Sequence, residues 1–321
     1  MRLGVVIPCY RQERFLPRTL AALEHSLAGR DWSGVLVLSA PGEAAALPPL
    51  SQHWRVVRPV LAPDAHPLTP GAARNAGFAA SGGTWVLFVD ADVEVDSQWI
   101  VRAFNVMSDE PRLAGLWGRL EEWFVDGGHE RPGSRDMYRV GDDDHDSDYL
   151  ATLALYRRVA LEQVGGYEPS LSSEEDFELG LRLRREGFVL RSVAPCAGRH
   201  WSGPRPSFSE IGRRWRSGLC FGQGQVLRLY AGRPGFNQHL RRQSLYLGTL
   251  AFWSTLPAFL LGGHARLWFG LALAFFVALS VRKRSPRLAL HSLLMWTVNT
   301  AGMLVGLTQR RSPAVVQVKA V

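Results

Sequence analysis

The nine residues from Thr84 to Asp92, TWVLFVDAD, constrain the fold more than any other part of the chain. Their apolar run, with β-branched and aromatic residues, is typical of a buried strand. Side chains alternate along an extended backbone, so Asp90 and Asp92 are expected to point the same way. Two converging carboxylates suit a hard cation such as Mg²⁺ or Mn²⁺. The alternative that the motif alone leaves open is a strand followed by a solvated acidic turn.

Strand and helix signals alternate through the first three quarters of the chain. This alternation predicts an α/β fold with a mostly parallel sheet and helices on both faces. Ligands of such sheets bind beyond the carboxyl ends of the strands, where Asp90 and Asp92 would lie. The pattern predicts strands over Leu3–Ile7, Val35–Leu38, Val56–Val60, Thr84–Val89 and Val189–Val193, and helices over Arg14–Leu27, Gly71–Ala80 and Trp99–Met107.

Charge is divided unevenly along the chain. Residues 241–321 contain 10 Lys or Arg and no Asp or Glu, so the first 240 residues carry 27 basic and 29 acidic side chains. This near-neutral region argues against a nucleic-acid-binding protein. The three cysteines lie far apart without metal-ligand spacing, which fits a reduced compartment and argues against structural zinc or a disulfide framework. The apolar stretch at residues 3–7 is too short for a signal peptide.

The tail of the chain predicts hydrophobic helices associated with a membrane. Leu245–Gly263 and Leu288–Leu307 are long enough to span a bilayer, whereas Leu267–Val281 is shorter. Clusters of Lys and Arg flank these runs and would attract anionic lipid headgroups. Two spans with one interfacial helix and three spans both stay open, as does a set of buried core helices. We therefore expect two regions, residues 1–233 and a membrane-associated region of residues 234–321.

A second carboxylate cluster lies between Ser172 and Gly187. Ser172 and Glu175 have the spacing of a capping box, Glu178 and Arg182 form an i,i+4 pair, and Gly187 suits a helix end. The segment is therefore predicted to be a helix with an acidic first turn. The helix dipole explains such a turn without any function. A carboxylate aimed into a cleft could instead act as a general base.

Four motifs together resemble those of the family 2 glycosyltransferases. They are VVIPCY at 5–10, GAARNAG at 71–77, DAD at 90–92, and ED at 175–176 with LRLR at 181–184. Their order and spacing match the family, and the resemblance covers about residues 1–230. It implies a GT-A fold, which is a Rossmann-like sheet that holds a nucleotide sugar. It also implies inverting sugar transfer that uses a divalent metal, Mg²⁺ or Mn²⁺.

The resemblance implies a role for each residue at a matching position. The implied nucleotide-sugar contacts are Pro8, Tyr10, Glu13, Arg74 and Asp90. The implied metal ligands are Asp92, Asp90 and His200, although a lone histidine is also often structural. Asp176 would deprotonate the acceptor hydroxyl, with support from Glu175. Arg214 and Trp215 would contact the acceptor or the diphosphate, although Ile211 stands where the family's motif has glutamine.

The sequence also departs from the family pattern. The second strand runs into Ser39-Ala40-Pro41 where aspartates usually read the base, so UDP is only the default nucleotide. The segment Ala151–Arg158 resembles the family's strand-to-helix connection but lacks its usual asparagine. The acidic run Asp142–Asp146 is consistent with a solvated acceptor loop or with a second metal site.

The sequence therefore predicts an inverting, metal-dependent glycosyltransferase with its catalytic domain at the cytoplasmic face of the cell membrane. Its expected partners are a nucleotide-sugar donor, a glycan or lipid-linked acceptor, and membrane lipids. A polyprenyl-phosphate sugar transferase is a close alternative, because such an acceptor is already an anion and needs no base. A non-catalytic nucleotide-sugar-binding scaffold is an alternative of another class, favoured by the missing aspartates after the second strand.

Overall fold

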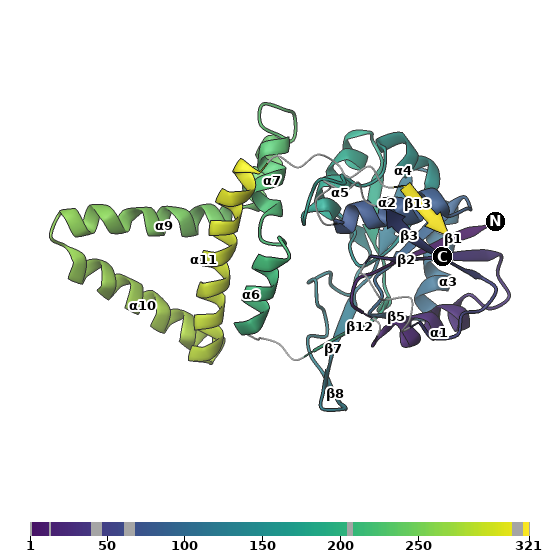
Figure 1. Cartoon of the computed structure of the whole chain (residues 1–321), viewed down its shortest axis with the longest axis horizontal. Coiled ribbons are helices and arrows are strands. Elements are labelled where there is room, and N and C mark those ends of the chain that lie inside the picture. The colour runs from purple at the N-terminus through teal and green to yellow at the C-terminus, as the bar shows by residue number, and fades with distance from the viewer. Residues whose placement is uncertain are drawn as a thin grey trace. The chain divides into compact units, whose positions relative to one another are not determined.

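The computed structural model describes residues 2–12, 14–39, 47–60, 68–203, 208–309 and 317–320. The chain divides into two units, which Figure 1 shows with the course of the chain. The first unit contains residues 1–170, 175–204 and 311–321, and the second contains residues 171–174 and 205–310. The predicted division after residue 233 concerns functional regions and stays a prediction.

The first unit is built on a sheet that has nine strands in the described part of the chain. The strands are β1 (Leu3–Cys9), β2 (Trp32–Leu38), β3 (Trp54–Val60), β4 (Trp85–Val89), β6 (Leu113–Trp117), β9 (His145–Asp146), β10 (Leu153–Arg157), β11 (Val189–Ser192) and β13 (Gln317–Ala320). Their order is β13-β3-β2-β1-β4-β10-β6-β11-β9. The strands β1 to β4 are parallel, whereas β10 runs antiparallel to β4 and β6.

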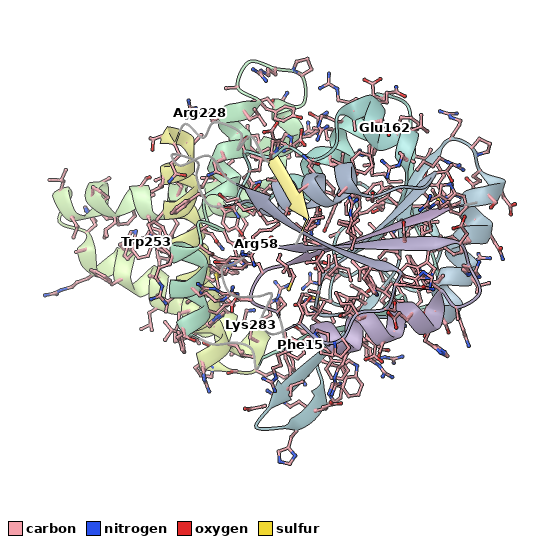
Figure 2. The ribbon with its side chains drawn as sticks, turned by 45° about the vertical axis from the view of Figure 1, so that its right-hand side comes forward. Phe15, Arg58, Glu162, Arg228, Trp253 and Lys283 are labelled. Carbon is pink, nitrogen blue, oxygen red and sulfur yellow. The ribbon has the colours of Figure 1, made fainter. Side chains whose placement is uncertain are left out.

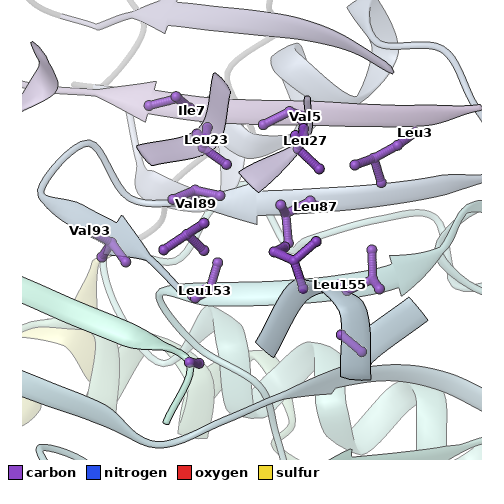
Figure 3. Packing of buried hydrophobic residues seen from close by; sticks show 14 of the residues in the cluster. Leu3, Val5, Ile7, Leu23, Leu27, Leu87, Val89, Val93, Leu153 and Leu155 are labelled. Atoms are coloured by element: carbon purple, nitrogen blue, oxygen red, sulfur yellow. The ribbon is translucent and has the colours of Figure 1, made fainter. Parts of the chain in front are cut away.

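Helices cover both faces of this sheet, which explains why its central strands are apolar on both sides. The helices of the first unit are α1 (Leu16–Ser26), α2 (Pro70–Ala80), α3 (Ser97–Asp109), α4 (Arg158–Val164) and α5 (Glu175–Arg185). Val5 and Ile7 pack with Leu23 of α1, as Figure 3 shows, whereas Val6 packs in the cluster on the opposite face. The predicted α/β class, with helices on both faces of the sheet, is confirmed.

A second, smaller sheet lies in the same unit and was not predicted. Its strands are β5 (Val93–Val95), β7 (Leu120–Asp126), β8 (His129–Pro132) and β12 (Gly198–Ser202). Among the described residues their order is β5-β12-β7-β8. Because β5 follows β4 after a short turn, this sheet brings β12 to the carboxyl end of the central strand.

The helix α5 exists as predicted but begins later than the predicted capping box requires. Its first residue is Glu175, and Glu174 before it has a left-handed φ of 72°. Ser172 therefore does not cap the helix, and the predicted box is wrong. The predicted pair between Glu178 and Arg182 does form, with Arg182 Nε donating to Glu178 Oε1 at 2.6 Å.

The second unit is helical. Its helices are α6 (Phe208–Arg216), α7 (Gly222–Leu229), α8 (Phe236–Arg242), α9 (Ser244–Leu261), α10 (Ala265–Lys283) and α11 (Pro286–Thr308). In Figure 1, α6 and α7 lie along α11, while α9 and α10 extend away from it. Within the described residues, α9, α10 and α11 are long and apolar enough to cross a membrane. These helices agree with the three predicted apolar runs and support association with a membrane.

Candidate active site

Asp90 and Asp92 lie in a turn at the carboxyl end of β4. The strand ends at Val89, and the Val93 N–H donates to the Asp90 carbonyl oxygen at 3.1 Å. The pleat of the strand therefore stops before Asp90 and does not set the directions of the two carboxylates. The directions of the two carboxylates are set instead by their contacts, and each carboxylate has its own partners.

The carboxylate of Asp92 lies among side chains from two distant segments. Gln12 Nε2 donates to Asp92 Oδ2 at 3.0 Å, and His200 Nε2 lies 3.5 Å from the same oxygen. His200 belongs to β12, whose antiparallel pairing with β5 places it opposite Val93. Asp92 and His200 are both buried. The small sheet therefore brings together two of the residues that the resemblance assigns to the metal.

Asp92 and His200 fit a divalent cation that is bound together with its substrate. Mg²⁺ is usually held by one or two carboxylates together with substrate phosphates, and carboxylate oxygens also suit Mn²⁺. Across the described ranges there is no group of three or more His, Cys, Asp or Glu side chains that could hold a metal ion by itself. The donor set is thus adequate for an ion whose other ligands come from a diphosphate.

Arg74 connects the Asp90 carboxylate with the carboxylates of α5. Its Nη2 lies 3.0 Å from Asp90 Oδ1, and its Nη1 lies 2.9 Å from Glu175 Oε1 and 3.7 Å from Asp176 Oδ1. The guanidinium also lies over the ring of Tyr167, 5.3 Å from its centroid. One buried cation thus holds three acidic residues from two parts of the sequence around a single point.

The environment of Arg74 makes its charge permanent. Burial alone lowers the pKa of the guanidinium, but the carboxylates of Asp176 and Asp90 outweigh this effect and raise the pKa above its ordinary value. The side chain of Asp176 is 22% exposed and that of Glu175 is 8% exposed. Asp176 is therefore the more accessible of the two α5 carboxylates to a second reactant.

Three further residues of the site were not predicted from the sequence. They are Gln12, which donates to Asp92, and the pair Tyr138 and Thr152. The hydroxyl groups of Tyr138 and Thr152 share a hydrogen bond. Thr152 has a left-handed φ of 59°, which is rare for a β-branched residue. Its carbonyl oxygen accepts a hydrogen bond from the Asp90 N–H at 2.9 Å. The strained residue thus fixes the backbone that carries Asp90.

One of these residues has a sequence signal, although a weak one. Gln12 comes three residues after the end of β1, so it lies at the same sheet edge as Asp92. Tyr138 lies in a loop with no motif of its own. Burial raises the pKa of its phenol well above the ordinary value, so it stays protonated and can donate a hydrogen bond. Only the folded structure identifies it.

The predicted nucleotide contacts at the end of β1 lie at this edge of the sheet. Pro8 pairs with Val37 of β2, near the end of the strand. Tyr10 follows the strand with 56% of its surface exposed, and the Arg11 guanidinium lies 5.4 Å from the centroid of its ring. Glu13 lies outside the described residues. An exposed aromatic ring here is available to a planar base, and the roles of these residues stay predictions.

Arg214 and Trp215 belong to α6 of the second unit. The ring of Trp215 packs edge-on against Phe221, with the centroids 5.2 Å apart. It is also partly exposed. The proposed contacts of both residues with an acceptor or a diphosphate stay predictions.

Arginines balance the acidic run that was considered as a second metal site. Asp142 pairs with Arg119 at 2.8 Å, and Asp144 pairs with Arg102 at 2.7 Å. Burial raises the pKa of Asp144, but hydrogen bonds from the Ala194 N–H and from Arg102 outweigh it and lower the pKa. The side chain of Asp142 is largely exposed. These contacts favour the solvated-loop interpretation.

Comparisons with known proteins confirm the GT-A fold that the resemblance implies. The mannosyltransferase PcManGT from Pyrobaculum calidifontis, solved with GDP-Man and Mn²⁺, is similar in structure, with a TM-score of 0.62 and 16% identity over 95% of this chain and 87% of that chain. S. aureus TarS 1–349, solved with UDP-GlcNAc, has a TM-score of 0.47 and 16% identity over 64% of this chain. This chain matches 60% of the length of that TarS structure.

The sequence comparisons give one clear assignment. No curated protein matches the chain significantly. The sequence model described as "Glycosyl transferase family 2" matches residues 4–165, which include most of β1, all of α2 and the Asp90–Asp92 turn. The match covers half of the chain, and the protein therefore belongs to glycosyl transferase family 2.

Proposed function

We propose that this glycosyltransferase moves a sugar from a nucleotide-sugar donor to a hydroxyl group of a glycan or lipid-linked glycan, with inversion and with a divalent metal. The observation that carries the proposal is the presence of two groups of carboxylates at one edge of the sheet. Asp92 lies beside His200, while Asp90 and Asp176 approach different nitrogens of the Arg74 guanidinium. The mannosyltransferase solved with GDP-Man and Mn²⁺ supports the donor class and the metal.

The donor would bind at the carboxyl ends of β1 and β4. Tyr10 and Pro8 would contact the base and ribose, and Asp90 would approach the ribose. Asp92 and His200 would hold Mg²⁺ or Mn²⁺, which would offset the charge that develops on the diphosphate leaving group. Gln12 would orient the Asp92 carboxylate through the 3.0 Å hydrogen bond already present. Because Arg74 is committed to three carboxylates, its contribution to donor binding would be mainly electrostatic.

The transfer itself would use Asp176 as the general base. The acceptor oxygen forms a bond to the anomeric carbon of the sugar while the bond from that carbon to the phosphate oxygen breaks. The hydroxyl proton passes to the Asp176 carboxylate, and attack opposite the leaving group inverts the anomeric centre. Glu175, bonded to Arg74 at 2.9 Å, would keep the guanidinium beside Asp176 in place.

The reaction would take place at the surface of a membrane. The apolar helices α9, α10 and α11 support association with a bilayer, and we propose that the catalytic unit lies at its cytoplasmic face. A lipid-linked acceptor would present its glycan to the same edge of the sheet.

Nucleotide binding to the detergent-purified full chain tests the proposal. We expect one of the nucleoside diphosphates UDP and GDP to raise the melting temperature in Mn²⁺ but not in EDTA, since a ligand of the native state stabilises it by about 2.7 kcal/mol at 100 times its Kd. The Asp92→Asn variant should lose the metal-dependent part of this shift and its metal-dependent hydrolysis of the donor.

Asp109→Asn is the matched control, because Asp109 is an exposed aspartate at the end of α3. It should retain the whole nucleotide response. A metal-dependent shift that survives in Asp92→Asn would contradict the metal assignment. A wild-type chain that melts cooperatively but responds to neither nucleotide would contradict the donor site itself.

A further inference from the structure

The course of the chain restricts how its apolar helices can cross a membrane. The strand β13 pairs antiparallel with β3, from Gln317 opposite Val60 to Ala320 opposite Val57. Both strands belong to the large sheet of the first unit, and the second unit is inserted between residues 204 and 311. A hydrogen-bonded sheet lies on one side of a bilayer. The chain therefore leaves and returns to the same side.

The number of membrane crossings must consequently be even. The helices α6, α7 and α8 contain 9, 8 and 7 residues, far fewer than the roughly 20 that a crossing needs. Seven residues separate Gln309 from β13, and they include Arg310 and Arg311. A charged connection of this length does not cross a hydrocarbon layer, where only helices and closed barrels satisfy the backbone. Three crossings by α9, α10 and α11 are thus incompatible with the sheet.

Burial distinguishes α9 and α10 from α11. Within the described residues, α9 has no buried side chain and α10 has one, Trp268. By contrast, α11 buries six residues, including Asn299 and Thr300. Apolar side chains that the protein does not bury need an apolar surrounding, and α9 and α10 offer such surfaces over about 27 and 28 Å of helix. That length approaches the roughly 30 Å of a bilayer core.

The partner of α11 is a polar helix. A Cβ on Gly224 of α7 would come within 1.9 Å of the Met303 carbonyl oxygen, so the two helices pack backbone against backbone. Gln225 Nε2 donates to Gln309 Oε1 at 3.1 Å. Arg228, labelled in Figure 2, donates to the Thr308 carbonyl oxygen at 3.5 Å. A helix in contact with Gln and Arg side chains along α7 belongs at a polar boundary.

The basic residues agree with this division. With two crossings, one side holds Arg241, Arg242, Arg282, Lys283, Arg284, Arg287, Arg310 and Arg311. The other side holds Arg266, which follows the turn at Gly262–His264. An excess of Lys and Arg on one side is the rule for short membrane loops, and anionic headgroups attract such groups. Three crossings would move Arg310 and Arg311 to the side that otherwise holds one arginine.

We propose that α9 and α10 form a hairpin that crosses the bilayer twice, and that α11 lies along the membrane surface beside α6 and α7. The partner of this surface is a bilayer with anionic headgroups on the side of the catalytic unit. Figure 1 agrees, because α9 and α10 meet at their far ends and diverge toward the two ends of α11. The proposal concerns topology and does not depend on the identity of donor or acceptor.

Accessibility of tags and thiols tests this topology in the full chain. Epitope tags are added to both ends, and His264→Cys and Arg284→Cys are made separately in a chain carrying Cys196→Ser. Both positions are exposed, and the two remaining cysteines, Cys9 and Cys220, are buried. A membrane-impermeant maleimide and a protease are applied to intact cells and to inverted vesicles.

We expect both tags to be digested in the same preparation. The thiol of Arg284→Cys should react in that preparation, and the thiol of His264→Cys in the other. Tags on opposite sides would overturn the even number of crossings. Reaction of both thiols from one side would overturn the crossing hairpin. Neither readout needs activity, so a failure of the proposed function would leave the result unchanged.

Discussion

At the residue scale, the candidate site depends on the charge balance around Arg74. One guanidinium lies within 3.7 Å of carboxylate oxygens from Asp90, Glu175 and Asp176. Removing one partner of a buried ion pair leaves charges without compensation and costs about 3–5 kcal/mol. The sequence identified all four residues by resemblance, but their mutual contact is seen only in the fold, where Arg74 of α2 reaches the turn after β4 and the first turn of α5.

Arg74→Gln is therefore expected to lower the stability of the first unit. A loss of about 3 kcal/mol corresponds to a melting temperature lower by about 6–12 °C for a unit of this size. Scanning fluorimetry without ligand measures this change. Arg74→Lys keeps the charge but not the fork of donors, so its melting temperature should lie between those of wild type and Arg74→Gln. Equal melting of all three proteins would contradict a structural role for the cluster.

Asp176→Asn separates the proposed chemistry from donor binding. The change keeps the size of the side chain but removes the base, so transfer to a hydroxyl acceptor should fall by about 10²–10⁴-fold. The metal-dependent thermal shift with nucleotide should remain. Assays with radiolabelled donor and a hydroxyl acceptor measure the first effect. Unchanged transfer to a polyprenyl phosphate would instead identify an anionic acceptor, and loss of nucleotide binding would assign Asp176 to the donor.

The lowered pKa of His239 predicts that the second unit loses stability in acid. Burial lowers its pKa to about 4, with a further lowering by Arg242 that Glu174 opposes. The unfolded chain then binds more protons than the native chain between about pH 4 and pH 6.5, so stability is complete above pH 6.5 and falls as the pH falls toward 4. The loss is on the order of a few kcal/mol.

A variant and a pH series test this prediction. The melting temperature of the second unit in wild type should fall between pH 6.5 and pH 4. In His239→Gln it should start lower, because a buried side chain has been replaced, but it should depend less on pH over this range. Parallel pH curves for the two proteins would show that another group causes the acid sensitivity.

At the element scale, glycines determine how closely α7 and α11 pack. A Cβ on Gly306 would lie 2.0 Å from the Phe221 carbonyl oxygen, and backbone atoms cannot move aside as a flexible side chain can. Gly306→Ala is expected to cost about 1–3 kcal/mol through overpacking. Gly270→Ala in α10 is the matched control, because a Cβ there meets nothing within 4 Å.

Thermal unfolding of the purified variants measures the difference. Gly306→Ala should melt below wild type, whereas Gly270→Ala should melt at or above it because alanine favours helix over glycine by up to about 1 kcal/mol. If Gly306→Ala melted like Gly270→Ala, the close packing of α7 and α11 would be disproved.

Elements with strong periodicity could be predicted from the sequence, and elements defined by pairing could not. The strand ending before Asp90 was recognised because five apolar residues from Trp85 to Val89 are buried on both faces. The small sheet was missed because β5 has three residues and β8 has four exposed ones. Such strands are stable only through their neighbours. His200 therefore meets Asp92 for a reason that no local pattern contains.

At the scale of the whole molecule, composition predicted the membrane-associated region but not its return to the sheet. Residues 241–321 combine long apolar runs with an absence of Asp and Glu, and this composition is visible in the sequence itself. The short strand β13 has no hydrophobic pattern from which its pairing with β3 could be predicted. Long-range pairing of this kind depends on the sheet edge that the first residues have already built. The sequence therefore left two and three crossings open, and the pairing is what distinguishes them.

The position of β13 also sets an order of events during synthesis. Its residues emerge from the ribosome about 250 residues after β3, which at about 5–20 residues per second is a delay on the order of 10–50 s. During that time β3 is the uncovered edge of a growing sheet, and such edges recruit other chains. Arg55, Arg58 and Pro59 lie on this strand, and charges and proline are the features that discourage such pairing. The nascent protein thus carries its own protection against aggregation until insertion of the helices allows the last strand to dock.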